Sequence, residues 1–356
     1  MTEADALPEA DRAGDAPHPR DTPVLFGQAA AEASFLDAWT TGRMHHGWLL
    51  TGPRGVGKAT LAWRIARFLL TDPPADADSL DPTPGHATLP QIAALSAPGL
   101  MLLRRPWDQK AKRLATQITV DEVRRLGPFF GMSAGGRRVV IVDAADDLNP
   151  SAANAILKLL EEPPARSTLL LIAHQPARLL PTIRSRCRVL RLAPLAGSDL
   201  SAAVEQAGGV PDPAQLALAE GSVGAALSLA DGGARIYGDL IDLLSRTPMD
   251  RARARRLADA CAGKAGAERL QQTLDALDRL LHRAARAGLL GPPEDAPEAE
   301  AKVLARLAPH DQAARAWAQL AQDVGDRAGH ARAVNVDPAS IVWDALSRID
   351  AQARRV

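Results

Sequence analysis

A glycine-rich stretch early in the chain carries the residue types that bind phosphate. It follows the pattern G-x-x-x-x-G-K, and the residues that define the pattern are Gly52, Gly55, Gly57 and Lys58. In this pattern backbone N–H groups wrap the phosphates of a nucleotide, and the lysine pairs with the outer ones. The next residue should supply a hydroxyl that ligates Mg²⁺, but Ala59 stands there. The stretch therefore predicts a nucleotide-binding loop that has lost part of its hydrolytic machinery.

The residues on either side of the loop have the patterns of a strand and a helix. Residues 47–51 form a short apolar run suited to a buried strand, and apolar residues recur at helical spacing over 60–70. Strand, glycine loop and helix is the order that a phosphate-binding loop requires, and it disfavours an ordinary glycine-rich turn. Thr60 is the only nearby hydroxyl that could replace the missing ligand. We therefore expect ATP or ADP to bind weakly, with Thr60 as part of the site.

A second part of this site is predicted where another apolar run ends in an acid. The run over 137–143 ends at Asp143. In P-loop ATPases an acid at this position holds the metal ion of the nucleotide. A Glu beside it polarises the attacking water, but the neighbour here is Ala144. Asp146 and Asp147 would have to move to substitute for it. We therefore place Asp143 in the nucleotide site and expect hydrolysis by this chain alone to be lost.

The elements that follow continue an alternation of helices and strands. Over 149–164, Asn149 can cap a helix, Pro150 fits its first position, and a double proline ends it. Residues 168–173 form a third buried strand. Residues 181–187 then lead into a further extended run over 189–192. The pattern is that of an α/β domain with a parallel sheet.

These motifs together resemble those of the AAA+ clamp-loader subunits of bacterial DNA polymerase III. The resemblance rests on the run ILKLLEEPP, on the triplet Ser185-Arg186-Cys187, and on the segments 24–28 and 46–53. It is specific over residues 22–195 and looser beyond. It implies an α/β P-loop AAA+ domain followed by an α-helical lid and an α-helical collar. The eroded hydrolytic positions resemble the delta-prime branch of the family more than its gamma/tau motor branch.

The same resemblance gives Arg186 a role in catalysis on a neighbouring subunit. In such assemblies the arginine of the Ser-Arg-Cys triplet reaches the ATP of the next subunit and neutralises charge on the transferring phosphate. The alternative is a solvated basic face, since Arg184, Arg186 and Arg188 alternate as residues of a strand do. Cys187 is expected to be a small buried residue rather than a nucleophile.

Three features depart from the family. Its members commonly place four cysteines with zinc-ligand spacing after the phosphate-binding loop, but residues 71–99 contain none, so no zinc and no other protein-held metal is expected. His174 stands where hydrolysing relatives place a polar sensor, and we interpret it as a surface turn residue. Gly224 stands where the second-sensor arginine is expected. All three departures favour a subunit that does not hydrolyse ATP.

Composition fits this interpretation. Lysine plus arginine and aspartate plus glutamate each number 42, so no global charge attracts nucleic acid. The basic runs at 104–113 and 251–256 are interpreted as solvated faces that could still contact DNA phosphates. Two cysteines indicate a reducing compartment, and no apolar run is long enough to cross a membrane, so we expect a cytoplasmic protein.

The chain is expected to have four parts. These are a disordered acidic tail over 1–20, the AAA+ domain over 21–195 without a zinc module, a helical lid over 196–245, and a helical collar over 246–356. An independent helical bundle with its own role is the alternative for the collar.

The function implied by the resemblance is that of a stator subunit of the clamp loader, which helps to load the sliding clamp onto primed DNA. Its partners would be the delta and gamma/tau subunits, the clamp, and primed DNA held in the assembled ring, with no membrane partner. The alternative is an ATP-hydrolysing motor subunit in which Thr60 and Asp146 compensate. A P-loop kinase is a third reading, but it leaves the LEEPP and Ser-Arg-Cys segments without a role.

Overall fold

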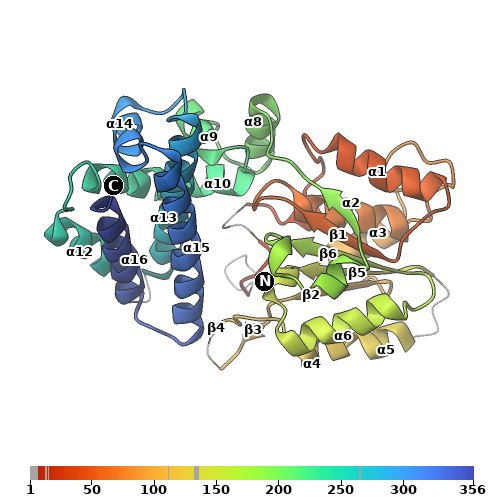
Figure 1. Cartoon of the computed structure of the whole chain (residues 1–356). Helices are drawn as coiled ribbons and strands as arrows, with labels where there is room; N and C mark the ends of the chain where they lie inside the picture. Colours follow the sequence, from red (N-terminus) through yellow and green to blue (C-terminus); the bar gives the residue numbers. More distant parts are fainter. Residues whose placement is uncertain (1–6, 13, 15, 111, 132–135, 264–265) are drawn as a thin grey trace. The chain divides into compact units, whose positions relative to one another are not determined.

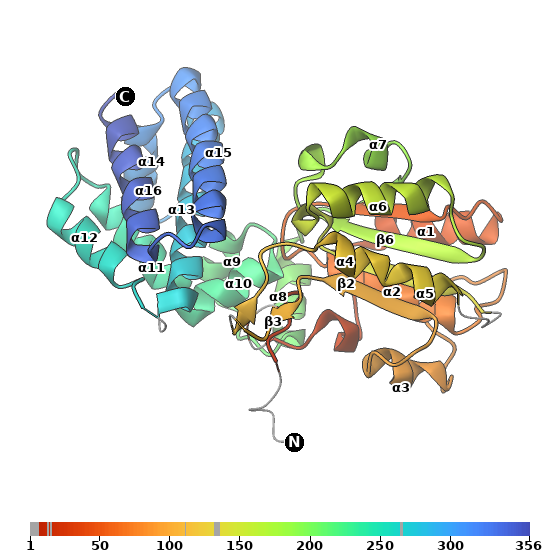
Figure 2. The ribbon, with the colours of Figure 1, turned by 90° about the horizontal axis from the view of Figure 1, so that it is seen from below.

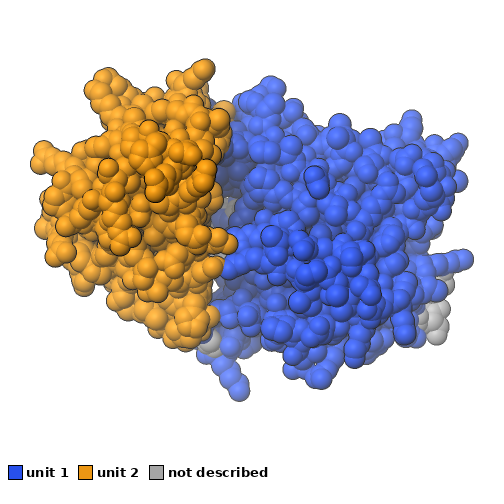
Figure 3. All heavy atoms as spheres, in the orientation of Figure 1, with its two compact units in different colours: residues 1–212, 219–226 blue, residues 213–218, 227–356 orange. Residues whose placement is uncertain are grey.

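The computed structural model describes residues 7–12, 14, 16–110, 112–131, 136–263 and 266–356. The chain divides into two compact units (Figure 3), of which unit 1 comprises 1–212 and 219–226 and unit 2 comprises 213–218 and 227–356. The helices expected to form a lid over 196–245 are shared between these units. A lid that forms a domain of its own therefore stays a prediction.

Unit 1 is built on a five-stranded sheet whose strands all run parallel, in the order β2-β5-β6-β1-β7 (Figure 1). The strands are β1 (Gly47–Thr51), β2 (Leu100–Arg104), β5 (Arg138–Asp143), β6 (Ser167–Ala173) and β7 (Arg188–Arg191). Because the strands are parallel, the residues that follow β1, β5 and β6 meet at one edge of the sheet, where α/β proteins bind ligands. The order of the sheet thus decides which sequence motifs become neighbours.

Helices cover both faces of the sheet, so the domain has three layers (Figures 1 and 2). Successive residues of β1 point to opposite faces: Trp48 and Leu50 join one apolar core, and Leu49 joins the other. The first core is shared with α1 (Ala29–Thr40), α2 (Lys58–Leu70) and α3 (Thr88–Ala93), and the second with α4 (Val120–Arg124), α5 (Leu126–Gly131) and α6 (Pro150–Glu161). The expected α/β domain with a parallel sheet is confirmed.

Unit 1 also contains smaller elements. They are the two-stranded hairpin β3 (Trp107–Asp108) and β4 (Arg113–Leu114), with α7 (Pro181–Arg184) and α8 (Gly197–Gln206). The predicted start of α6 is present, because the Asn149 side chain accepts a hydrogen bond of 2.8 Å from the Ala152 N–H and Pro150 occupies the first helical position. The helix ends at Glu161, two residues before the double proline.

The N-terminal segment is ordered where the structure describes it. Residues 1–6, 13 and 15 lie outside the described residues, but from residue 7 onward the expectation of a disordered tail is wrong. Asp11 and His18 are buried and paired at 3.0 Å, and Arg104 forms ion pairs with Asp11 and, at 2.9 Å, with Glu9. His18 also stacks edge-on against Trp63 of α2. Composition alone gave the wrong answer because these contacts are made with residues far along the chain.

In its described residues, unit 2 contains helices and no strands, and its role as the expected collar stays a prediction. Its helices are α11 (Ala234–Leu243), α12 (Arg251–Asp259), α13 (Gly266–Leu290), α14 (Glu298–Leu307), α15 (Asp311–Ala333) and α16 (Pro338–Ala353). Two shorter helices, α9 (Pro213–Ala219) and α10 (Val223–Ser228), contain the points where the chain passes between the units. The helix α13 runs beside α15, and a single apolar core fills the bundle (Figure 1).

A buried polar cluster lies within this bundle. Glu300 accepts hydrogen bonds from the Arg283 guanidinium at 2.6 Å and from the Tyr237 hydroxyl at 2.5 Å. Burial and the neighbouring carboxylate raise the pKa of Tyr237, so its hydroxyl stays protonated and donates.

No helix among the described residues is long and apolar enough to cross a membrane.

Candidate functional site

The glycine loop connects β1 to α2, in the strand–loop–helix arrangement that the sequence predicts. Gly52, Gly55 and Gly57 have φ angles of 144°, 73° and 98°, which side chains rarely adopt. A Cβ atom on Gly52 would lie 2.3 Å from the carbonyl oxygen of Leu192, just after β7. Glycine is therefore required here both by the backbone conformation and by the close approach of the neighbouring chain.

Lys58, the first residue of α2, is buried beneath the loop rather than extended into solvent. Its ammonium group donates hydrogen bonds to the carbonyl oxygens of Gly52 and Pro53, at 2.7 Å and 2.5 Å. Burial lowers the pKa of Lys58 to about 8, while Asp143 and Asp146 act in the opposite direction. The group that would pair with phosphate is thus engaged by the loop's own backbone.

Asp143 ends β5 and lies within electrostatic reach of Lys58, as the sequence predicts for the metal-binding acid. The pKa of Asp143 is raised to about 7, mainly by burial and also by the Asp11 and Asp147 carboxylates, while the charges of Lys58 and Arg54 oppose the rise. The N-terminal segment therefore adds negative charge to this edge of the sheet. Near neutral pH the Asp143 carboxyl is partly protonated, which weakens it as a metal ligand.

The two eroded positions are small apolar residues that contribute to packing. Ala144, beside Asp143, is buried, and Ala59 packs against the apolar core on the α2 side of the sheet. Thr60 is half-buried and lies one residue further along α2, about 100° around the helix axis from Ala59. The structure thus places Thr60 on a different face of α2 from the position where the magnesium-ligating hydroxyl is expected.

Two carboxylates that could have replaced the missing glutamate have other partners. Asp146 accepts hydrogen bonds of 2.7 Å from the backbone N–H groups of both His174 and Gln175. Asp147 pairs with Arg105 at 3.1 Å. Each carboxylate therefore holds the carboxyl edge of the sheet together, which opposes its use as a base.

His174 and Arg54 belong to this site, and of the two the sequence singled out only His174. The interpretation of His174 as a surface turn residue is wrong: the side chain is half-buried, and its Nδ1 atom is enclosed. Burial, together with the positive charges of Lys58 and Arg54, lowers the pKa of His174 to about 3, so the imidazole is neutral. Its place directly after β6, between the strands that carry the loop and Asp143, was the available signal.

The segment expected to carry the second sensor closes over the loop. The backbone N–H of Val223 donates to the Gly55 carbonyl at 2.9 Å. A Cβ atom on Gly55 would lie 2.3 Å from the Ser222 hydroxyl and 2.8 Å from the Gly224 backbone nitrogen. Gly224 lies against the loop but has no side chain that could reach a phosphate.

Arg186 is not part of this cluster. It lies between α7 and the start of β7, and Arg188 pairs in register with Trp48 near the start of β1. The glycine loop follows the other end of β1, so five residues of extended chain, about 16 Å, separate the two ends. Arg186 therefore belongs to the amino edge of the sheet and the glycine loop to the carboxyl edge.

The residues around Arg186 are only partly a solvated basic face. Arg188 lies over the Trp48 ring at 5.2 Å, and Arg186 pairs with Glu161 at 3.1 Å. Burial raises the pKa of the half-buried Cys187 to about 12, so its thiol stays protonated and is a poor nucleophile.

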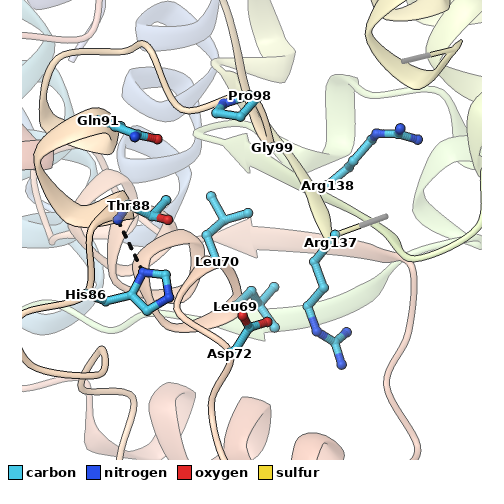
Figure 4. A pocket seen from close by; sticks show the side chains of 11 residues that line it. Leu69, Leu70, Asp72, His86, Thr88, Gln91, Pro98, Gly99, Arg137 and Arg138 are labelled. Atoms are coloured by element: carbon cyan, nitrogen blue, oxygen red, sulfur yellow. Dashed lines mark hydrogen bonds between the residues drawn. The ribbon is translucent and has the colours of Figure 1, made fainter. Parts of the chain in front are cut away.

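A cavity of about 210 Å³ lies at the amino edge of the sheet, where the segment 71–99 meets β5 (Figure 4). Leu70, His86, Gln91 and Arg137 are among the residues that line it. The His86 side chain bonds to its own loop: its Nδ1 accepts a hydrogen bond of 3.2 Å from the Thr88 N–H. Among the described residues, no three His, Cys, Asp or Glu side chains are grouped so that they could hold a metal ion.

Comparison with known proteins identifies relatives of this chain. The sequence profile of a family described as DNA polymerase III, delta subunit, matches residues 27–196. The chain is 43% identical over 159 residues to a DNA polymerase III subunit delta' of Pseudomonas aeruginosa, covering 44% of this chain and 45% of that one. It is 36% identical over 203 residues to the subunit delta' of Escherichia coli, covering 55% and 57%. The chain thus spans about half the length of the curated relatives it matches.

Two further similarities are weaker. A DNA polymerase III subunit gamma of Buchnera aphidicola is 28% identical over 245 residues, covering 65% of this chain and 63% of that one. A solved structure, a DNA polymerase III gamma subunit-related protein of Thermotoga maritima, is 16% identical with a TM-score of 0.39, covering 90% of this chain and 100% of that one.

Proposed function

We propose, on the premise that this chain belongs to the delta-prime family of DNA polymerase III subunits, that it is a stator of the clamp loader. In this role it would not hydrolyse ATP itself but would help an ATP-driven assembly to place the sliding clamp on primed DNA. The observation that carries the proposal is the contrast between the two edges of its sheet. At the carboxyl edge the polar groups of the glycine loop bond to other groups of the same chain, and at the amino edge Arg186 is partly exposed.

The carboxyl edge supports binding without hydrolysis. The hydroxyl and the carboxylate that hydrolysis needs are replaced by Ala59 and Ala144, and Asp146 and Asp147 are engaged elsewhere. Lys58 would have to leave two carbonyl oxygens to reach a phosphate. We therefore propose that ATP or ADP binds weakly here, held by the glycine loop with Lys58, Thr60 and Asp143, and that no turnover follows.

The amino edge supports a role in trans. Arg186 lies about one strand length from the chain's own loop, so a phosphate that it contacts must belong to another molecule. A guanidinium is always charged and presents its donors in a planar fork, which suits a phosphoryl group whose charge is spread over several oxygens. The proposed neighbour is a gamma/tau subunit on this side, with a delta subunit as the other partner.

The alternative is an ATP-hydrolysing subunit, and the intact glycine loop is the observation that favours it. In that case Lys58 would break its two backbone contacts when nucleotide binds, and Thr60 would have to rotate toward the metal. The two functions differ in which residue the ATPase of the assembly depends on.

The test is to reconstitute the clamp loader with Arg186→Ala or Lys58→Ala in this subunit and to measure ATP hydrolysis stimulated by clamp and primed DNA. Removal of an arginine finger should slow the site it serves by about 10³-fold or more. Total hydrolysis should therefore fall to the share of the remaining sites, whereas Lys58→Ala should leave it within about twofold. An unchanged rate with Arg186→Ala, or a collapse with Lys58→Ala, would overturn the proposal.

A further inference from the structure

We propose that Glu161 is the positioning residue for Arg186: it orients the guanidinium toward the neighbouring subunit's phosphate. This inference rests on the proposed function, since it assigns a partner to the arginine that acts in trans. It also gives a role to Glu161, the first glutamate of the LEEPP run, which has no role in the proposed nucleotide site.

The contact joins the ends of two elements that are distant in sequence. Arg186 Nη2 lies 3.1 Å from Glu161 Oε1 at the end of α6, and Arg186 Nη1 donates to the Thr182 carbonyl of α7 at 3.2 Å. Figure 2 shows α7 beside α6, on the same side of the sheet. The side chains of Arg186 and Glu161 are 39% and 42% exposed, so the guanidinium is held from one side and is open to a partner on the other.

Both ends of the pair are fixed to the start of β1. His46 Nε2 donates to the Leu160 carbonyl, one residue before Glu161, at 2.9 Å. A Cβ atom on Gly47 would lie 2.6 Å from the Leu160 side chain and 3.2 Å from the Arg186 carbonyl oxygen. The backbone segments next to Glu161 and Arg186 therefore both pack against His46 and Gly47. What remains variable is the set of side-chain torsions of Glu161 and Arg186.

The ion pair sets those torsions without using up the arginine. A guanidinium has five N–H donors, and the two contacts in the structure leave donors free for phosphate oxygens. A carboxylate on one side restricts the swing of a long side chain, which lowers the entropy lost when the phosphate is engaged. Glu161 should then affect the rate of hydrolysis rather than the binding of ATP.

The next residue supplies a matched control. Glu162 has the same charge at the same helix end and is exposed, and its backbone N–H caps the helix by donating to Lys158. A change of Glu162→Gln removes one negative charge from the end of α6 and leaves the Arg186 contact in place. Any effect of charge on the helix end or on the general field should therefore appear equally in both variants.

The experiment measures kcat and KM for ATP in the reconstituted assembly with Glu161→Gln, Glu162→Gln, Arg186→Ala and the double variant Glu161→Gln/Arg186→Ala. Since exposed ion pairs contribute modestly, Glu161→Gln should slow the one site that Arg186 serves about two- to fivefold. The kcat of the assembly should then fall toward, but not below, its value with Arg186→Ala, with KM unchanged, and Glu162→Gln should change neither. In the Arg186→Ala background, Glu161→Gln should have no further effect, because the only group it positions is absent.

The outcomes distinguish the positioning role of Glu161 from the proposed role of Arg186 in trans. If Arg186→Ala leaves hydrolysis unchanged, the role in trans fails and the inference fails with it. If Arg186→Ala lowers the rate but Glu161→Gln does not, the role in trans stands and only the inference is overturned. An equal loss from Glu161→Gln with and without Arg186 would mean that Glu161 acts on the fold, and an equal loss from Glu162→Gln would mean that helix-end charge is responsible; both contradict it.

Discussion

The two edges of the same parallel sheet have opposite characters. At the carboxyl edge, Lys58 donates to the carbonyls of its own loop and the Gly55 carbonyl is taken by Val223. At the amino edge, Arg186 is anchored by Glu161 and Thr182 but stays partly open. The comparison shows that one edge of a sheet can engage its polar groups within the chain while the opposite edge leaves a charged side chain partly exposed.

The carboxyl edge should tolerate no side chain at its tightest point. We expect Gly52→Ala to lower the free energy of unfolding by about 3 kcal/mol or more, because its φ of 144° is strained for alanine and the added carbon would meet the Leu192 carbonyl at 2.3 Å. Gly42→Ala is the control: its φ is 68°, but open space surrounds it, so the loss should be about 1 kcal/mol. Urea unfolding followed by circular dichroism measures both, and equal losses would contradict the close approach.

The raised pKa of Asp143 should make its contribution to stability depend on pH. In the folded chain this pKa is about 7 instead of 3.8, so the folded state holds the proton over a range in which the unfolded state has released it. Stability is therefore lost as pH rises from about 4 to about 7, and an ionised Asp143 remains unfavourable above that.

We accordingly expect Asp143→Asn to stabilise the chain by roughly 2 kcal/mol at pH 8 and to have little effect at pH 4. The neighbouring charges of Lys58 and Arg54 keep the gain below what burial alone would give. Denaturant unfolding at pH 4, 6 and 8 checks this, with the exposed Asp121→Asn as the control. A gain that does not vary with pH would show that Asp143 is not held in a raised-pKa environment.

The ion pair of Arg186 at the amino edge should contribute almost nothing to the stability of the fold. Arg186→Ala breaks an ion pair that is about two-fifths exposed, so the free energy of unfolding should change by no more than about 0.5 kcal/mol. The same urea experiment measures it, with Arg184→Ala at the exposed end of α7 as the reference. A loss well above 1 kcal/mol would mean that Arg186 serves the fold, and it would weaken the contrast between the two edges.

Local patterns in the sequence were enough to find the elements of the site. The glycine spacing placed the loop between a strand and a helix, the acid after an apolar run placed Asp143 at the end of β5, and the Asn149-Pro150 pair placed the start of α6. These predictions succeed because backbone conformation and capping depend on neighbours within a few residues.

Other features could not be predicted because they depend on residues far apart in the chain. Asp11 and His18 looked like part of a disordered tail, yet both are buried and bound to each other, and Asp11 also pairs with Arg104. His174 looked like a surface residue until the sheet order placed the end of β6 beside Lys58. Composition describes average solvation, and it cannot say which distant side chain will meet a charge.

Residue types at fixed spacing were enough to predict the α/β domain and to find alanine at positions 59 and 144. The three-dimensional arrangement was needed to show that Lys58 is engaged by its own loop, that Asp146 binds the chain after β6, and that Glu161 meets Arg186. It also separated Arg186 from the loop by the length of β1. The physical reason is that the strand order sets which chain ends share an edge, and that order is fixed by packing over the whole sheet.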